Sequence, residues 1–332
     1  MRVLVTGGAG FIGSHTVVSL IEAGHEPVIV DSLTNAQRSV IARIGEITGV
    51  VPRFVEADIR DRTVMDDVLK DGFDACIHLA ALKAVAESVD KPLEYYDNNV
   101  VGTIRLLEAL ADSGVTRFVF SSSCTVYGEP EELPLTENMP IGSATNPYGW
   151  TKIIMEQVLK DFHVSMPDWS ISLLRYFNPV GAHPSGVIGE DPSGIPNNLM
   201  PNIAKAAAGE IPQVTVFGDD YPTPDGTGVR DFVHVVDLAE GHVVALDHHA
   251  GDAGVFTYNL GTGVGTSVLE LINAYRVASG QPIPYEVLPR RTGDVAANWA
   301  DVGKARNALG WEATRDLAEM CTDSWRWHQK AR

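Results

Sequence analysis

A tyrosine and a lysine stand four residues apart in the segment YGWTK, residues 148–152. A spacing of four places both side chains on one face of a helix. A phenol with a solution pKa of about 10 is a poor base, but a neighbouring ammonium favours its phenolate form. We therefore expect Tyr148 to exchange a proton with a substrate hydroxyl near neutral pH, with Lys152 biasing its ionisation.

Three consecutive serines, Ser121–Ser123, end an apolar, strand-like stretch that begins at Arg117. The carboxyl end of a parallel strand lies at the edge of the sheet where ligands bind. A serine hydroxyl placed there can hydrogen-bond the oxygen whose proton the tyrosine handles. The alternative is a hydroxyl-rich strand end that caps the following turn, and the serines alone do not decide between the two.

Short β-branched runs alternate with longer helical patterns through the first half of the chain. Buried strands are predicted over 3–6, 27–31, 53–57, 74–79, 117–121 and 170–175. Apolar residues at three- and four-residue spacing predict helices over 11–22, 61–70, 103–112 and 148–162. Strands that alternate with helices form a parallel sheet with right-handed crossovers. The sequence therefore predicts an α/β fold with a doubly wound, Rossmann-type parallel sheet.

Three glycines follow the first predicted strand at regular spacing: Gly7, Gly10 and Gly13. Glycines let the chain turn tightly and approach a pyrophosphate at a helix N-terminus. Asp31 ends the second predicted strand, where a carboxylate accepts hydrogen bonds from ribose hydroxyls and repels a 2′-phosphate. This pattern favours NAD over NADP. The alternative is a plain glycine turn and a helix-capping aspartate.

Further cofactor contacts are expected where the third and fourth predicted strands end. Asp58 and Ile59 would meet the adenine, and the small residues of the segment Leu79–Ala81 would let the backbone lie against the cofactor. Lys83 would reach a ribose or a phosphate. A lone lysine is more often a solvated surface charge, so its role stays open.

Composition and charge exclude several classes of function. The 332 residues carry 25 Lys and Arg against 43 Asp and Glu, a formal net charge of −18, which argues against nucleic-acid or anionic-membrane partners. The three cysteines lie far apart and form no CxxC pair, so we expect reduced thiols and no metal site. Without a long apolar run or a signal-peptide pattern, the protein is expected to be soluble and cytoplasmic.

Together, the glycine turn, Asp31, the serine run and the YxxxK helix resemble the extended short-chain dehydrogenase/reductase superfamily. Four further segments are similar to motifs of the UDP-glucose 4-epimerase family: SVDKPLEYYDNN at 88–99, LRYFNPVGAHP at 174–184, GIPNNLMP at 194–201 and GVRD at 228–231. These motifs span nearly the whole chain. The resemblance implies a homodimer that interconverts UDP-galactose and UDP-glucose through a 4-keto sugar, with NAD as a cofactor that shows no net redox change.

The resemblance also implies roles for individual residues. Tyr148 is the proton-exchanging base, with Lys152 and Ser123 as the other catalytic residues. The expected cofactor-binding residues are Gly7, Gly10, Phe11, Ile12, Gly13, Asp31, Asn35, Asp58, Ile59, Leu79, Ala80, Ala81, Lys83, Asn98, Ser121, Tyr148, Lys152 and Phe177. The expected substrate-binding residues are Lys83, Ser123, Tyr148, Asn178, Asn198, Leu199, Thr215, Val216, Phe217, Arg230, Arg291, Asp294 and Asn298.

The charge of a UDP-sugar agrees with the two arginines in that set. A diphosphate brings about two negative charges to an acidic protein, and forked guanidinium groups are well suited to hold them. Any single arginine could instead form a surface salt bridge. The strand-like stretch at 215–217 could pair with or stack on the uracil.

Domain organisation follows from a change of character near residue 178. Segment 178–198 holds eight Gly or Pro in 21 residues, and 218–228 is a second such tract, which predicts loops that shape a binding site. We expect an NAD-binding Rossmann domain over 1–177 and a smaller α/β domain over 178–332 that mainly binds the UDP-sugar. The chain is expected to return to the first domain around 231–262.

One position departs from the family pattern. Asn298 stands where the family often has a bulky tyrosine. A smaller side chain there would widen the sugar pocket, and this predicts tolerance of 2-acetamido sugars such as UDP-GlcNAc and UDP-GalNAc. A neighbouring side chain could equally fill the space.

Two alternative functions stay open. A nucleotide-sugar dehydratase or reductase uses the same scaffold, but a 4,6-dehydratase needs an acid pair after the hydroxyl residue Thr125, and here Val126 and Tyr127 follow. A non-catalytic NAD-binding sensor would keep the glycine turn but would have no need for the Tyr148 and Lys152 pair.

Overall fold

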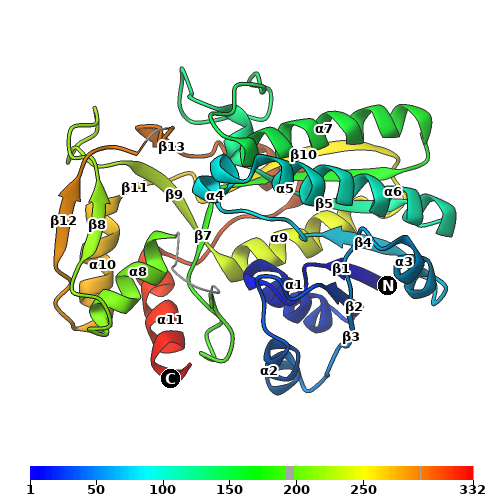
Figure 1. Cartoon of the computed structure of the whole chain (residues 1–332), viewed down its shortest axis with the longest axis horizontal. Coiled ribbons are helices and arrows are strands. Elements are labelled where there is room, and N and C mark those ends of the chain that lie inside the picture. Colours follow the sequence, from blue (N-terminus) through cyan, green and yellow to red (C-terminus); the bar gives the residue numbers. More distant parts are fainter. Residues whose placement is uncertain (192–197, 292, 332) are drawn as a thin grey trace.

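The computed structural model describes residues 1–191, 198–291 and 293–331. The first half of the motif at 194–201, up to Asn197, and Thr292 lie outside the described residues. Figure 1 shows a larger α/β body that holds the N-terminus and a smaller body beside it that holds the C-terminus.

A seven-stranded parallel sheet forms the centre of the larger body. Its strands lie in the order β10-β6-β5-β4-β1-β2-β3. Their bounds are β1 (Arg2–Thr6), β2 (Glu26–Asp31), β3 (Arg53–Glu56), β4 (Ala75–His78), β5 (Arg117–Ser123), β6 (Ser170–Tyr176) and β10 (Gly254–Leu260). The order reverses between β1 and β4, and ligands bind at such a switch point. The predicted doubly wound fold is confirmed.

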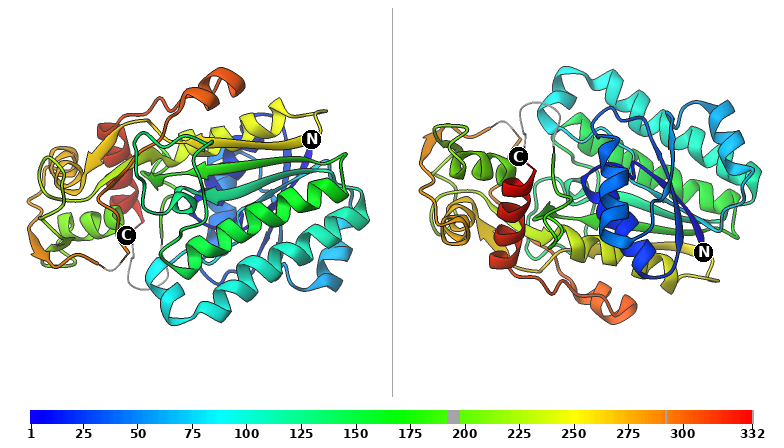
Figure 2. Two further views of the ribbon diagram at one scale, coloured as in Figure 1. Left: turned by 90° about the horizontal axis from the view of Figure 1, so that it is seen from above. Right: turned by 90° about the horizontal axis from the view of Figure 1, so that it is seen from below.

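Helices cover both faces of this sheet (Figure 2). One face carries α1 (Phe11–Glu22), α2 (Ser39–Thr48) and α9 (Val235–His248), and the other carries α3 (Arg62–Leu69), α6 (Gly102–Ser113) and α7 (Pro147–Ser165). Alternate side chains of β1 point to opposite faces of the sheet. Val3 and Val5 pack with α1 on one face, and Leu4 packs with α6 on the other. Burial on both faces explains why these strands read as continuous apolar runs.

The connection between β4 and β5 contains short helices that the sequence analysis did not predict. These are α4 (Val85–Asp90), α5 (Pro92–Tyr95) and a π-helical turn, η1 (Tyr96–Val101). Asn99 in η1 accepts a hydrogen bond from the amide of Leu82 at 2.8 Å and donates to the Thr151 hydroxyl at 3.2 Å. This side chain therefore ties the segment after β4 to the start of α7.

The smaller body is built on short strands and three helices. Strands β7 (Asn178–Val180), β9 (Val229–His234), β11 (Gly265–Ser267) and β13 (Ala297–Asn298) form one sheet, and β8 (Val214–Phe217) pairs with β12 (Tyr285–Leu288). Helices α8 (Leu199–Ala207), α10 (Val268–Ser279) and α11 (Leu317–Lys330) pack around a second apolar core that includes Met200, Phe232 and Tyr275. Two further short turns are η2 (Cys124–Tyr127) and η3 (Ala305–Leu309). Among the described residues, no helix has the length and hydrophobicity to cross a bilayer.

Candidate active site

Tyr148 lies in the first turn of α7, next to the carboxyl end of β5. Helix α7 begins there because the side chain of Asn146 accepts a hydrogen bond from the amide of Gly149 at 2.9 Å and Pro147 fills the first helical position. The hydroxyl of Ser123, the last residue of β5, accepts a hydrogen bond from the amide of Thr125 at 3.2 Å and lies close enough to the Tyr148 phenol to lower its pKa. The structure thus brings together the tyrosine and the serine that the sequence analysis singled out.

Lys152 lies one turn further along α7 and is buried. Its Nζ donates to the carbonyl oxygen of Ser121 at 2.6 Å and lies 4.9 Å from the centre of the Phe120 ring. The same nitrogen is 5.9 Å from the centre of the Tyr148 ring. Burial lowers the pKa of Lys152 to about 7, and the nearby carboxylate of Glu156 opposes that change.

The ionisation of Tyr148 differs from the expectation drawn from the sequence. Burial raises the pKa of Tyr148 to about 12 and outweighs the opposing effect of the nearby Ser123 side chain. The Lys152 ammonium donates to the carbonyl oxygen of Ser121, 5.9 Å from the centre of the Tyr148 ring, and its effect on the ionisation of Tyr148 stays a prediction.

The glycine turn between β1 and α1 packs so closely against the backbone around it that neither Gly7 nor Gly13 could carry a side chain. Gly7 has φ +73°, and a Cβ placed there would lie 2.5 Å from the amide nitrogen of Ala80. A Cβ on Gly13 would lie 2.1 Å from the carbonyl oxygen of Gly7. Within the described residues, no side chain caps the N-terminus of α1 and no acidic residue stands in its first turn. This cradle of amides, which includes Phe11 and Ile12, fits the pyrophosphate of a dinucleotide.

Asp31, at the end of β2, lies beside this turn. Its carboxylate accepts hydrogen bonds from the amides of Ala9 at 3.1 Å and Leu33 at 2.8 Å. Burial raises the pKa of Asp31, and the two amide hydrogen bonds oppose that change. A carboxylate held next to the cradle is placed to meet an adenosine ribose.

The other residues predicted to bind the cofactor surround the same edge of the sheet. The Asp58 carboxylate is held by Arg60, and the Asn98 side chain donates to Asn99 at 2.9 Å. Lys83 forms an ion pair with Glu190 at 3.3 Å. Ser121, Ile59 and Phe177 are buried, Leu79, Ala80 and Ala81 are partly buried, and Asn35 is exposed.

A second cluster contains both arginines predicted to bind the substrate. Arg291 forms an ion pair with Asp294 at 2.8 Å, and its guanidinium lies 4.8 Å from the centre of the Phe217 ring. Burial lowers the pKa of Arg230, and the charge of Asp294 opposes that change. The Thr145 hydroxyl donates to the carbonyl of Gly293 at 3.3 Å, which joins this loop to the start of α7. The cluster therefore lies next to the segment that carries Tyr148.

The remaining predicted substrate residues belong to the smaller body. Asn178 begins β7, and Thr215 and Val216 lie on β8 beside Phe217. Asn198 precedes the first turn of α8, which begins at Leu199, and its side chain donates to Glu190. Asn298 on β13 lies opposite Arg230 on β9 in a parallel register.

Tyr221 and Glu190 also lie beside the predicted residues, but neither was predicted from the sequence. Tyr221 is buried, with the Arg290 guanidinium 4.1 Å from its ring centre. In the described part of the chain, buried polar atoms of Tyr221, Thr125 and Asn298 have no hydrogen-bond partner. Such atoms are candidates to bind a ligand. The glycine- and proline-rich tract at 218–228 was the available signal for Tyr221, while Glu190 had none.

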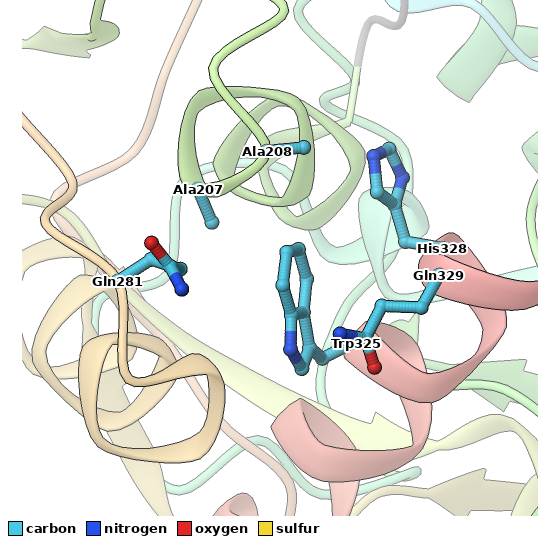
Figure 3. Close-up of a pocket in the computed structure, with 6 residues that line it drawn as sticks. All are labelled: Ala207, Ala208, Gln281, Trp325, His328 and Gln329. Atoms are coloured by element: carbon cyan, nitrogen blue, oxygen red, sulfur yellow. The ribbon is translucent and has the colours of Figure 1, made fainter. Parts of the chain in front are cut away.

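A cavity of about 430 Å³ lies elsewhere, between the end of α8 and α11 (Figure 3). Its lining residues are Ala207, Ala208, Gln281, Trp325, His328 and Gln329. His328 is the one titratable side chain among these six, so the cavity offers no acid–base pair. None of these lining residues is among those predicted to bind the cofactor or the substrate.

The chain is similar to known proteins over nearly its whole length. The model of the NAD dependent epimerase/dehydratase family matches residues 3–261. The chain is 57% identical over 328 residues to UDP-glucose 4-epimerase of Bacillus subtilis (strain 168), covering 98% of this chain and 96% of that protein. Its structure resembles UDP-glucose 4-epimerase from Bifidobacterium longum in complex with NAD+ and UDP, with a TM-score of 0.97, 53% identity and coverage of 99% and 98% of the two chains.

A more distant structure is also similar. The UDP-Glc/GlcNAc 4-epimerase from Campylobacter jejuni matches with a TM-score of 0.85 and 36% identity, covering 99% of both chains. The family model and the identity over nearly the full length agree with the geometry described above. The chain therefore belongs to the NAD-dependent epimerase/dehydratase family and, within it, to the UDP-glucose 4-epimerases.

Proposed function

We propose that the protein interconverts UDP-galactose and UDP-glucose by inversion at C4 of the sugar, with NAD as its cofactor. The observation that carries this proposal is that Tyr148, at the start of α7, and Ser123, at the end of β5, lie close together at the carboxyl edge of the sheet. That edge also holds the glycine cradle, and the cluster of Arg230 and Arg291 lies nearby. Relatives at this level of identity are UDP-glucose 4-epimerases, and one of them is known with NAD and UDP bound.

The residues present fit NAD, which when bound supplies a reversible hydride acceptor for C4. The amides at the start of α1 would hold the pyrophosphate, and Asp31 would bind the adenosine ribose. We further propose that residues 1–177, with the return segment 231–262, bind NAD. The rest of 178–332 would then mainly bind the UDP-sugar.

Tyr148 and Ser123 handle the proton of the 4-hydroxyl. In this proposal the Tyr148 phenolate accepts that proton, and the Ser123 hydroxyl hydrogen-bonds the same sugar oxygen. Tyr148 later returns the proton to that oxygen after the sugar has presented its other face. Arg230 and Arg291 hold the diphosphate meanwhile, so the nucleotide stays in place while the sugar turns.

The test of this function uses purified protein without added cofactor. Incubation with UDP-galactose is expected to give UDP-glucose, resolved by chromatography. No product, even with NAD supplied, would contradict the proposal and favour a dehydratase or reductase. Against a 4,6-dehydratase stands the absence of an acid pair in the described turn η2, where Val126 and Tyr127 follow Thr125.

We also propose that the sugar pocket accepts 2-acetamido sugars. Asn298 lies opposite Arg230 in the sheet, and its side-chain oxygen has no partner among the described residues. A relative of known structure is named as an epimerase of both UDP-Glc and UDP-GlcNAc.

Substitution of Asn298 tests this specificity. The protein as it stands is expected to convert both UDP-GalNAc and UDP-galactose. Asn298→Tyr is expected to lower kcat/KM for UDP-GalNAc at least about tenfold, because the larger side chain fills the space of the acetamido group. The kcat/KM for UDP-galactose is expected to change little. Both values are measured for the variant and for the starting protein. Failure of the unaltered protein to convert UDP-GalNAc would contradict the idea.

We propose that the protein acts in the cytoplasm as a homodimer. Exposed apolar side chains gather on the adjacent helices α4, α5 and α7, and a patch of this kind indicates an interface. Val89 is 61% exposed, Leu93 81% and Trp150 38%.

Leu93→Glu is expected to yield monomers in sedimentation equilibrium, because burial of a carboxylate in the interface is unfavourable. Val277→Glu on α10 is the control, since Val277 is 87% exposed outside the patch. A Leu93→Glu variant that remains a dimer would contradict the proposal that this patch forms the interface.

A further inference from the structure

A buried ion pair stands directly behind the catalytic helix. Glu156 on α7 and Arg175 on β6 are 0% and 3% exposed. They form two parallel hydrogen bonds, from Arg175 Nε to Oε1 at 2.8 Å and from Nη2 to Oε2 at 2.6 Å. None of the acid–base steps proposed above uses either residue.

The pair is connected to the serines at the end of β5. The Ser122 hydroxyl donates to Glu156 Oε1 at 2.6 Å. Its neighbours are Ser121, whose carbonyl oxygen accepts a hydrogen bond from Lys152, and Ser123, whose side chain lies close enough to Tyr148 to lower its pKa. The Glu156 carboxylate therefore fixes Ser122, the middle serine of the three, while the serines on either side of it lie next to Lys152 and Tyr148.

Arg175 extends the connection to two further segments. Its Nη1 donates to the Tyr127 hydroxyl at 3.0 Å and to the carbonyl oxygen of Glu137 at 3.2 Å. The Tyr127 hydroxyl in turn donates to Asn259 on β10 at 2.6 Å. The network thus joins α7, β5, β6, β10 and turn η2 around the catalytic pair.

Stability does not account for such a pair. Two charges removed from water lose much of their hydration, and apolar side chains of similar volume are often equally stable or more stable. A pair with every bond satisfied does fix the relative position of its elements. Glu156 also lies four residues after Lys152 on the same face of α7, which brings a negative charge near the ammonium.

We propose that Glu156 and Arg175 are positioning residues for the epimerisation. Glu156 holds Ser122, and through it Ser121 and Ser123, in register with α7, and its charge favours the ammonium form of Lys152. Arg175 orients this carboxylate inside the protein through two hydrogen bonds. This inference rests on the proposed function.

Several other groups face the Lys152 ammonium. Tyr148 lies on α7, and Tyr176 on β6 contacts Ser121. His78 on β4 has its pKa lowered to about 3 by burial and by the charge of Lys152, so it stays neutral. The Phe120 ring on β5 covers one side. Glu156 is therefore the one negative charge at neutral pH among these neighbours in the described structure.

The direction of the pH effect follows from this arrangement. The Glu156 carboxylate raises the pKa of Lys152 against the effect of burial. Loss of that carboxylate lowers this pKa further below about 7. The Lys152 ammonium then loses its proton at a lower pH. On the alkaline side of the pH profile, kcat is therefore expected to fall at a lower pH.

The double variant Glu156→Leu/Arg175→Met tests the proposal, because it removes both charges and leaves neither one unpaired. We expect it to fold and hold NAD, with KM for UDP-galactose within twofold of the starting protein. We expect kcat to fall about tenfold, with the alkaline limb shifted to lower pH by about one unit. Lys160→Met is the control, since Lys160 Nζ lies 3.9 Å from Glu156 Oε2 at the surface and its loss leaves the pair intact.

The outcomes separate this proposal from the proposed function. An unaltered kcat and pH profile in the double variant would overturn the positioning role while the function stands. An unaltered protein that is inactive on UDP-galactose would overturn both. If the double variant does not fold, Glu156→Gln is measured by the same criteria, and a kcat and pH profile like those of Lys160→Met would overturn the proposal.

Discussion

Replacement of Tyr148 by phenylalanine is expected to lower kcat for UDP-galactose by about a thousandfold. In the proposed mechanism the phenol takes the 4-hydroxyl proton, and the Ser123 hydroxyl, which accepts from the amide of Thr125, only hydrogen-bonds the sugar oxygen. The variant keeps the ring, so the packing of α7 against β5 is preserved. Bound NAD, measured after denaturation of the purified variant, is expected to match the starting protein.

Tyr275→Phe is the matched control for this experiment. Tyr275 is a fully buried tyrosine on α10 whose hydroxyl contacts Ser324 at 3.1 Å, in the core of the smaller body. Its loss removes one buried hydroxyl far from the serines and is expected to leave kcat unchanged. A Tyr148→Phe rate within tenfold of the control would show that another group moves the proton.

Gly7→Ala is expected to reduce bound NAD at least about tenfold. A Cβ at this position would lie 2.5 Å from the nitrogen and 2.8 Å from the Cα of Ala80, and these are backbone atoms that no side-chain rotation can move. The turn must therefore shift away from β4, which displaces the amides of the cradle. NAD content per subunit and NAD affinity measured by titration check this result.

Gly24→Ala separates the effect of close packing from that of backbone strain. Gly24 has φ +81°, close to the +73° of Gly7, but a Cβ there would meet nothing within 4 Å. Its substitution carries only the left-handed strain of about 1 kcal/mol and should leave NAD binding intact. Equal NAD content in the two variants would contradict a role for the Gly7 cradle.

Local pattern predicted most of the larger body. The strands β1 to β6 begin and end within two residues of their predicted bounds, because each is bounded by turn or charged residues. The predicted burial of β3 is wrong: Arg53 and Glu56 are exposed, since β3 is the edge strand of the sheet. Turn η1 and its Asn99 were missed. A π-helical turn has no sequence signature of its own, and it forms here where Asn99 bonds the segment after β4.

The predictions for the site rest on signals that each lie within a short stretch of sequence. Tyr148 meets Ser123 because α7 begins at the Asn146 cap and β5 ends at the serine run, and both signals are local. The raised pKa of Tyr148 depends on burial by the whole fold, which spacing along a helix does not report. The pairing of Glu156 with Arg175 likewise arises only when α7 packs on β6.

The most direct test of the proposed reaction follows the hydrogen at C4. UDP-galactose labelled with deuterium at C4 is incubated with the protein in ordinary water, without added NAD, and the product is analysed by NMR and mass spectrometry. Hydride transfer within one site predicts UDP-glucose that keeps the deuterium at C4, with none lost to solvent. Exchange of the deuterium with water would contradict the account, because it would mean that C4 is deprotonated rather than oxidised.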